Sequence, residues 1–211
     1  MKVLMVDVDG VLVHGRPSDG LSLFTYLERD HGLPLDTFQN EFFNPYWVGI
    51  VTGREPIEPR LSEVLKRIAP HLETETLLKY WFENDSLLDQ RLLDRLGALR
   101  QDDVRLYLAT NQEHRRAAYL MNEMGLGRHF DGIFYSADLG HRKPTHDFYR
   151  LATDSAGVSP SEIAFLDDML ENVEAAREFG WNAVQWMADM ELETALTSLT
   201  TPHPSRQPIR L

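Results

Sequence analysis

Two stretches of sequence decide the fold: VLMVDVDG at residues 3–10 and IAFLDD at residues 163–168. Each begins with four apolar residues and continues into a pair of carboxylates, Asp7 and Asp9 in the first and Asp167 and Asp168 in the second. A short apolar run that ends in polar residues is typical of a buried strand in a parallel sheet. Both acidic pairs are therefore predicted at the carboxyl ends of strands, the edge at which open α/β sheets bind ligands.

The spacing of these acids predicts a metal site. Residues two apart share a face of a strand, so Asp7 and Asp9 should project together, with Asp167 and Asp168 arriving from a neighbouring strand. Like charges about 4 Å apart repel by roughly 1–4 kcal/mol, so four carboxylates in one crevice need a counter-charge. Oxygen ligands without Cys or clustered His favour Mg²⁺. The alternative is that the second pair merely starts a helix, because Asp168 to Glu171 fits a capping pattern.

Composition limits the class of protein. The chain has 211 residues and is 43% hydrophobic, which is enough for one core and a modest inserted domain. Its net charge of −12 argues against a nucleic-acid partner. The absence of cysteine excludes disulfides and thiolate chemistry and fits a reducing compartment, so we expect a cytoplasmic location. We expect neither a signal peptide nor a membrane span, because no apolar stretch approaches about 18 residues. The sequence leaves open a monomer or a homodimer.

The order of the patterns predicts an α/β fold, a Rossmann-like parallel sheet flanked by helices. Strand-like runs occupy residues 2–7, 104–110, 132–137, 163–167 and 182–186, and helix-length patterns occupy residues 112–124, 145–156 and 172–179. Strands that alternate with helices of this length are typical of a parallel sheet that has helices on both faces.

One long gap interrupts this alternation. Residues 14–84 carry helical stretches such as 21–30 and 61–68, broken by Gly and Pro, and no convincing strand. Seventy residues are too many for a plain crossover, which predicts an inserted helical subdomain. The α/β core then comprises residues 1–13 and 85–187, and the helix 87–100 returns the chain to the sheet. Residues 188–211 should hold a helix, 189–199, and an extended or disordered tail, 200–211.

Two further segments reach the same edge of the predicted sheet. Thr110 and Asn111 follow a strand where a helix begins, and a hydroxyl with N–H groups at a helix start can bind phosphate. Thr110 to Glu113 is also a good capping box, and the two roles can coexist. Lys143 lies in the loop before the helix 145–156, where it could neutralise the acids and a bound phosphoryl group. The alternative is an ordinary solvated lysine.

Taken together, these motifs resemble those of a known superfamily. The residues Asp7-Val8-Asp9-Gly10-Val11, Thr110, Lys143-Pro144, and Asp167-Asp168 followed by Asn172 resemble, in this order, the four signature motifs of the haloacid dehalogenase-like (HAD) superfamily. The insertion resembles the helical (C1) cap of subfamily I. Residues 136–144 and 165–176 are similar to small sugar-phosphate phosphatases and to the phosphatase domain of epoxide hydrolases. The resemblance covers roughly residues 1–187.

The resemblance implies a role for each acid. Asp7 would be the nucleophile that forms an aspartyl-phosphate, and Asp9 would protonate the leaving alcohol and later activate water. Mg²⁺ would be held by Asp7, the backbone carbonyl of Asp9, and Asp168, with Asp167 acting directly or through water.

The resemblance also implies roles for the polar residues nearby. Thr110, Asn111 and Lys143 would hold the phosphoryl oxygens, and Asn172 would support the metal ligands from behind. The inserted segment would close over the site and exclude bulk water.

The implied activity is a Mg²⁺-dependent phosphatase that acts on a small phosphorylated, sugar-phosphate-like metabolite. Phosphomutases of similar build keep Asp9, whereas 2-haloacid dehalogenases, which need no proton donor, typically lack it. A binding protein that has lost the chemistry is a further alternative. The aromatic clusters at 46–49 and 80–83 could contact a leaving group, but such clusters more often form the core of a small subdomain.

Overall fold

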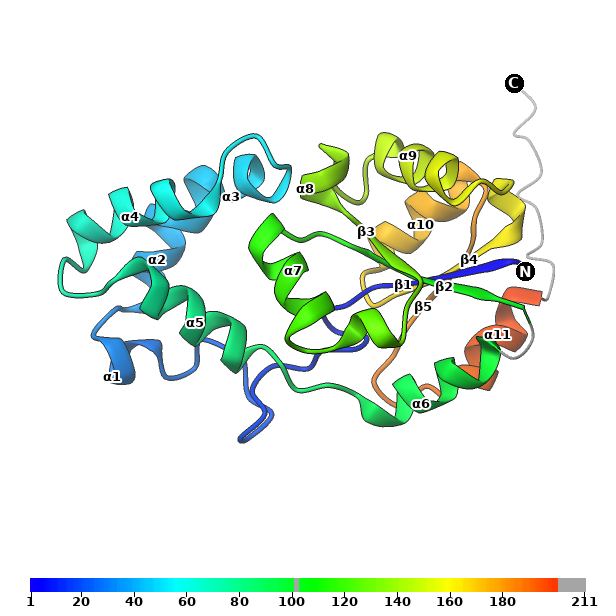
Figure 1. Cartoon of the computed structure of the whole chain (residues 1–211), viewed down its shortest axis with the longest axis horizontal. Helices are drawn as coiled ribbons and strands as arrows, with labels where there is room; N and C mark the ends of the chain where they lie inside the picture. Colours follow the sequence, from blue (N-terminus) through cyan, green and yellow to red (C-terminus); the bar gives the residue numbers. More distant parts are fainter. Residues whose placement is uncertain (101–102, 201–211) are drawn as a thin grey trace, which may run out of the picture.

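The computed structural model describes residues 1–100 and 103–200, so residues 201–211 of the predicted tail lie outside the described part. A five-stranded parallel sheet forms the centre of one lobe (Figure 1). Its strands are β1 (Val3–Val6), β2 (Arg105–Thr110), β3 (Gly132–Tyr135), β4 (Ile163–Asp167) and β5 (Asn182–Gln185). The spatial order is β3-β2-β1-β4-β5, and every pairing is parallel. The predicted α/β class is confirmed.

Helices cover both faces of the sheet. Leu4 and Val6 of β1 pack with α6 (Gln90–Leu99), α7 (His114–Asn122) and α11 (Leu192–Thr200). Val3 and Met5 point to the other face and pack with α9 (His146–Ala156) and α10 (Leu170–Phe179). In Figure 1, α6 and α11 lie on the side of the sheet opposite α9 and α10. Strands buried on both faces require apolar residues at consecutive positions, which explains the unbroken runs in the sequence.

The central strand β1 brings the two acidic motifs to one level. Val6 is opposite Leu108 of β2 on one side and opposite Leu166 of β4 on the other. From β1 the chain adds β2 and β3 on one side of the sheet and then crosses over to add β4 and β5 on the other side. The direction in which strands are added therefore reverses beside β1. Crevices at such reversal points, outside the carboxyl ends of the strands, are the usual ligand sites of open α/β sheets.

Some predicted element boundaries were wrong. The strand predicted at 132–137 ends at Tyr135, because Ser136–Leu139 form the short helix α8. There Ser136 Oγ and the Ala137 N–H both donate to the carbonyl of Gln112, and these bonds turn the chain out of the sheet. The helix predicted at 21–30 is confined to α1 (Leu27–His31), since residues 23–26 form turns.

Residues 14–84, here called the cap segment, form a second helical lobe (Figure 1). After α1 its elements are α2 (Leu35–Phe38), the π-helix η1 (Gln39–Phe43), α3 (Asn44–Val51), α4 (Ile57–Ile68) and α5 (Thr74–Asn84). They share a hydrophobic cluster distinct from those of the sheet. Trp47 and Trp81 lie in it with ring centroids 5.4 Å apart, and Trp81 and Phe82 are buried. Both aromatic clusters therefore contribute to the core of the segment.

The two connections of the cap segment lie side by side. The outgoing chain ends its first turn at Val13, and Val13 forms an antiparallel bridge with Leu88 on the returning chain. The carbonyl of Gly15 accepts hydrogen bonds from the N–H groups of Ser86 and Leu87, both 3.0 Å long. The His14 N–H donates to the carbonyl of Leu87, also over 3.0 Å. A displacement of either connection must therefore disturb the other.

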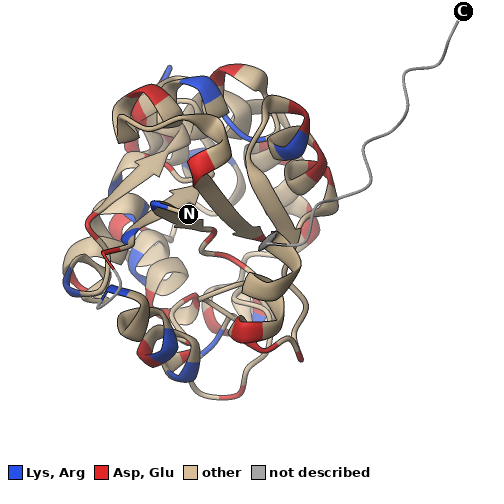
Figure 2. Ribbon diagram, turned by 90° about the vertical axis from the view of Figure 1, so that its right-hand side faces the viewer, with Lys and Arg blue, Asp and Glu red and all other residues tan. Residues whose placement is uncertain are grey.

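Charged residues of both signs are spread over the outer helices, as Figure 2 shows from one side. Several join helices through ion pairs, such as Arg91 with Glu191 and Arg95 with Glu193. Within residues 1–100 and 103–200, no helix has the length and apolar character that crossing a membrane requires.

Candidate active site

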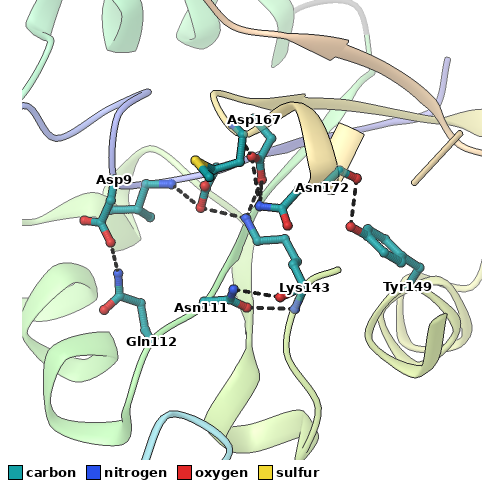
Figure 3. A network of polar contacts seen from close by, with 10 residues as sticks. Asp9, Asn111, Gln112, Lys143, Tyr149, Asp167 and Asn172 are labelled. Carbon is teal, nitrogen blue, oxygen red and sulfur yellow. Dashed lines mark hydrogen bonds and ion pairs between the residues drawn. The ribbon is translucent and has the colours of Figure 1, made fainter. Parts of the chain in front are cut away.

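Three carboxylates from the two acidic motifs gather at the reversal point of the sheet. Asp7 follows β1, Asp167 ends β4, and Asp168 comes next. One oxygen from each lies within 4.8 Å of the others, a separation at which they could share a metal ion. The carboxylate of Asp9 is not part of this group, although the sequence pattern placed four acids together. Its side chain turns instead toward Gln112 (Figure 3).

Gly10 permits the close approach of the second motif to the first. Its φ is +79°, and a Cβ built at this position would lie 2.4 Å from Oδ2 of Asp168. Any side chain here would both strain the backbone and displace the Asp168 carboxylate. The capping interpretation of Asp168 was wrong, because the N-cap residue of α10 is Met169 and no side chain caps this helix.

Lys143 lies inside the acidic group. Only 2% of its surface is exposed, and its Nζ lies 2.9 Å from Oδ1 of Asp7 and 2.6 Å from Oδ2 of Asp167. Asn111, the residue after β2, holds the lysine backbone: its Oδ1 accepts from the Lys143 N–H at 2.8 Å, and its Nδ2 donates to the Lys143 carbonyl at 3.1 Å (Figure 3). The alternative of a solvated loop lysine was therefore wrong. The Asn111 side chain braces the lysine loop.

Asp167 is held by several donors besides Lys143. The Met169 N–H donates to its Oδ1 over 2.8 Å, and Nδ2 of Asn172 lies 3.0 and 3.1 Å from its two oxygens. The carbonyl of Asn172 in turn accepts a hydrogen bond of 2.8 Å from the Tyr149 hydroxyl (Figure 3). The Asn172 amide thus holds the Asp167 carboxylate in place, and this carboxylate in turn holds Nζ of Lys143.

Gln112 is a site residue that the sequence interpretation missed. Its Nε2 donates to Oδ2 of Asp9 over 2.7 Å, and the side chain is buried. The sequence pattern places Gln112 only within a capping box that starts at Thr110. That box was wrong, because Glu113 caps α7 by accepting from the N–H groups of Arg115 and Arg116. Thr110 is buried at the end of β2, on the strand that adjoins β1. The available signal was the position of Gln112 beyond a strand end at the acidic edge.

Burial governs the protonation of the site. It raises the pKa of Asp7 to about 7, against the opposing effect of Lys143 and with the help of Asp167 and Asp9. Desolvation by the surrounding protein atoms also raises the pKa of Asp9, although this residue is exposed at the surface and Arg116 and the Gln112 hydrogen bond act in the other direction. Burial opposes the charge of Lys143, but Asp7 and Asp167 outweigh it and raise the lysine pKa. One lysine thus faces more negative charge than it can neutralise, and a bound cation would relieve the excess.

Fold and site together define a hydrolase of the α/β type with a cluster of carboxylates at the carboxyl edge of its sheet. The chain matches the haloacid dehalogenase-like hydrolase family over residues 1–180 and belongs to that family, which confirms the predicted superfamily. Among curated relatives, a sesquiterpene phosphatase of Aspergillus oryzae is 37% identical over 95 residues, covering 44% of this chain and 47% of the relative. Phosphoglycolate phosphatase of Escherichia coli is 26% identical over 102 residues, covering 48% and 40%. These matches span less than half of either relative.

Solved structures share the fold. A HAD family enzyme of Bacteroides thetaiotaomicron has a TM-score of 0.79 at 17% identity, covering 93% of this chain and 98% of that one. The same enzyme in complex with magnesium and inorganic phosphate has a TM-score of 0.76 at 17% identity, covering 92% and 98%. A magnesium-bound HAD hydrolase of Bacillus subtilis, described as revealing interdomain movement, has a TM-score of 0.65 at 20% identity, covering 95% and 99%.

Proposed function

We propose that this protein is a Mg²⁺-dependent phosphatase that hydrolyses a small phosphorylated metabolite through an aspartyl-phosphate on Asp7. One observation carries the proposal: the carboxylates of Asp7, Asp167 and Asp168 lie together, and the buried Lys143 contacts the first two of them. The Asp9 carboxylate lies outside this group and accepts a hydrogen bond from Gln112. Two curated relatives named as phosphatases support the reaction, and a structural relative that binds magnesium and phosphate supports the metal. The names of these relatives point to very different alcohols, so the cap segment would set the substrate.

The residues at the site fit Mg²⁺. Asp7 and Asp168 offer carboxylate oxygens, and the backbone carbonyl of Asp9 is the third candidate ligand. Both oxygens of Asp167 already accept hydrogen bonds, so its main role would be to hold Lys143. When bound, Mg²⁺ supplies positive charge that lets a carboxylate approach a phosphoryl group.

The side chains would then divide the work. A carboxylate oxygen of Asp7 bonds to phosphorus as the bond to the leaving oxygen breaks, and Asp9 gives its proton to that oxygen. In the second step Asp9 takes a proton from water, whose oxygen attacks phosphorus and releases phosphate from Asp7. Lys143 and Thr110 lie at the edge where the phosphoryl oxygens must sit. The cap segment would cover the site and exclude bulk water.

The direct test is phosphate release from a panel of phosphate monoesters by the Mg²⁺-loaded protein, with and without EDTA. We expect turnover of at least one small ester and its loss in EDTA. No release from a broad panel would refute the proposal. Faster isomerisation of a sugar phosphate than phosphate release would identify a mutase, and halide release from a 2-haloacid would identify a dehalogenase.

Asp9→Asn should slow esters according to their leaving group. An alkyl phosphate, whose alcohol must be protonated as it leaves, should lose about 10²–10⁴-fold in kcat/KM. Acetyl phosphate needs little protonation and should lose much less. The two substrates are compared by phosphate release in the same preparation, and an equal loss for both would contradict the acid role of Asp9.

Magnesium should stabilise the folded protein independently of any substrate. At a concentration about 100 times its Kd, a ligand stabilises by about 2.7 kcal/mol. For a chain of this size that corresponds to a rise in Tm of roughly 5–10 °C. Asp168→Asn should lose most of this shift, and Glu171→Gln, which removes an exposed acid at the start of α10, should keep it. A wild-type Tm that does not respond to Mg²⁺ would contradict the metal site.

A further inference from the structure

Arg116 is a buried charge that the proposed chemistry does not use. Only 2% of its surface is exposed, although it lies on α7 between the two lobes. Its Nη1 donates to the carbonyl of Phe82 over 3.3 Å, and its Nη2 donates to the carbonyl of Asp85. Nη2 also lies 3.3 Å from Oδ2 of Asp85. The Nε of Arg116 is buried and has no hydrogen-bond partner among the described residues. Burying a guanidinium costs free energy of desolvation, which only well-placed hydrogen bonds and ion pairs can offset.

The contacts of Arg116 lie where the cap segment rejoins the sheet. Asp85 is the C-cap residue of α5, and the next residues, Ser86 and Leu87, pair with Gly15 on the outgoing connection. The outgoing connection continues directly from the Asp9 loop, in which the Val13 N–H donates to Val8 over 2.9 Å and its carbonyl accepts from Gly10 over 2.9 Å. A shift of the returning chain would therefore reach the loop that carries Asp9.

A second route joins Arg116 to Asp9 through the segment that leads into α7. Gln112 lies two residues before the first residue of α7 and four positions before Arg116 in the sequence, and its side chain holds the Asp9 carboxylate (Figure 3). Among charged groups Arg116 has the largest effect on Asp9: it lowers the pKa of this carboxyl against the opposing effect of desolvation. Burial and then the charge of Asp9 raise the pKa of Asp85 to about 6. The guanidinium thus acts on two carboxylates: it contacts the half-buried Asp85 in the cap connection, and its charge reaches the exposed Asp9 in the site.

We propose that Arg116 and Asp85 form a clamp that holds the returning cap connection against α7 and thereby keeps the Asp9 carboxyl in position to protonate the leaving group. Arg116 is a positioning residue in this arrangement, because it acts through Asp9. The inference rests on the proposed function and adds to it a residue pair that couples the cap segment to proton donation. A lysine would keep the charge but not the fork that binds two carbonyls and a carboxylate together.

Arg116→Lys tests the clamp through its dependence on the leaving group. We expect kcat/KM for an alkyl phosphate to fall by about 10–100-fold, since small misplacements of a reacting group cost this much. Acetyl phosphate, which needs little protonation, should change by less than about threefold. The matched control is Arg115→Lys on the same helix, which keeps the charge but removes the two-point contact that Nη1 and Nη2 make with Glu75 of the cap segment, 2.6 and 2.8 Å long. It should affect both substrates equally.

Hydrogen exchange supplies a readout that needs no activity. The amides of Ser86 and Leu87 should exchange faster in Arg116→Lys than in the wild type, and Arg115→Lys should leave them unchanged. Unchanged exchange, or an equal loss of rate for both substrates, would overturn the clamp. If Arg116→Lys fails to fold, Asp85→Asn is held to the same two criteria. An inactive wild type would refute the proposed phosphatase alone, because the exchange measurement still decides whether Arg116 holds the connection.

Discussion

Asp7→Asn is expected to abolish phosphate release, lowering kcat by at least about 10⁴-fold, the order of loss seen when an enzyme loses its nucleophile. The amide has no carboxylate oxygen to bond to phosphorus, and Lys143 would lose its partner at 2.9 Å. The fold should persist, because Asn fills the same space at the end of β1. Protein quenched in acid during turnover should carry one phosphoryl group in the wild type and none in the variant, as measured by intact mass.

Controls separate this loss from damage to the fold. Asp138→Asn removes an exposed acid on α8 and should leave kcat and phosphoprotein formation unchanged. Asp7→Ala should match Asp7→Asn, which excludes recovery of the acid by deamidation. Residual turnover of the Asn variant above about one per cent of the wild-type rate would assign the nucleophile to another residue.

The stability of the metal-free protein should report the buried charge of Asp7. Its folded-state pKa of about 7 lies above the ordinary value of 3.8, so its contribution to stability is present below pH 4 and is lost as the pH rises through 7. In Asp7→Asn the amide does not titrate, so the variant does not lose this stability as the pH rises. In EDTA, the Tm of the variant minus that of the wild type should therefore increase from pH 5 to pH 8, and a difference that falls would contradict the pKa shift.

Lys143→Met should have the largest effect on stability. It removes the cation between Asp7 and Asp167, and breaking a buried pair on one side costs about 3–5 kcal/mol because an unpaired charge remains. In EDTA at pH 8 we expect the Tm to fall by roughly 6–20 °C, with Mg²⁺ restoring part of it. Phosphate release should be lost as well, because the remaining carboxylates repel the anionic substrate.

Two comparison variants test whether the loss of stability in Lys143→Met comes from the unpaired buried charge. Lys143→Met combined with Asp167→Asn removes both partners and should regain much of the stability without regaining activity. Lys79→Met removes an exposed lysine that faces Glu83 and should leave the Tm unchanged. If Lys143→Met were as stable as the wild type in EDTA at pH 8, the lysine would not be balancing the buried acids.

Local pattern was enough to predict the sheet. The run at 163–167 matches β4 and the run at 104–110 matches β2 to within one residue, because strands buried on both faces must be apolar at consecutive positions. The end of β3 was misplaced, since the helix that follows depends on hydrogen bonds to Gln112 from a distant segment. The predicted start of α7 is wrong for the same reason: the pattern predicts a capping box from Thr110, whereas Glu113 caps the helix.

The acidic motifs and their lysine were visible in the sequence, because residues after parallel strands must meet at one edge of the sheet. The sequence alone therefore determined the family, the strands and the identity of the acids. The tertiary structure decided which way Asp9 turns, that Asn111 braces Lys143, and that Arg116 binds Asp85. Strand and helix signals arise between residues close in the chain, whereas these contacts join segments up to about a hundred residues apart, and only packing brings them together.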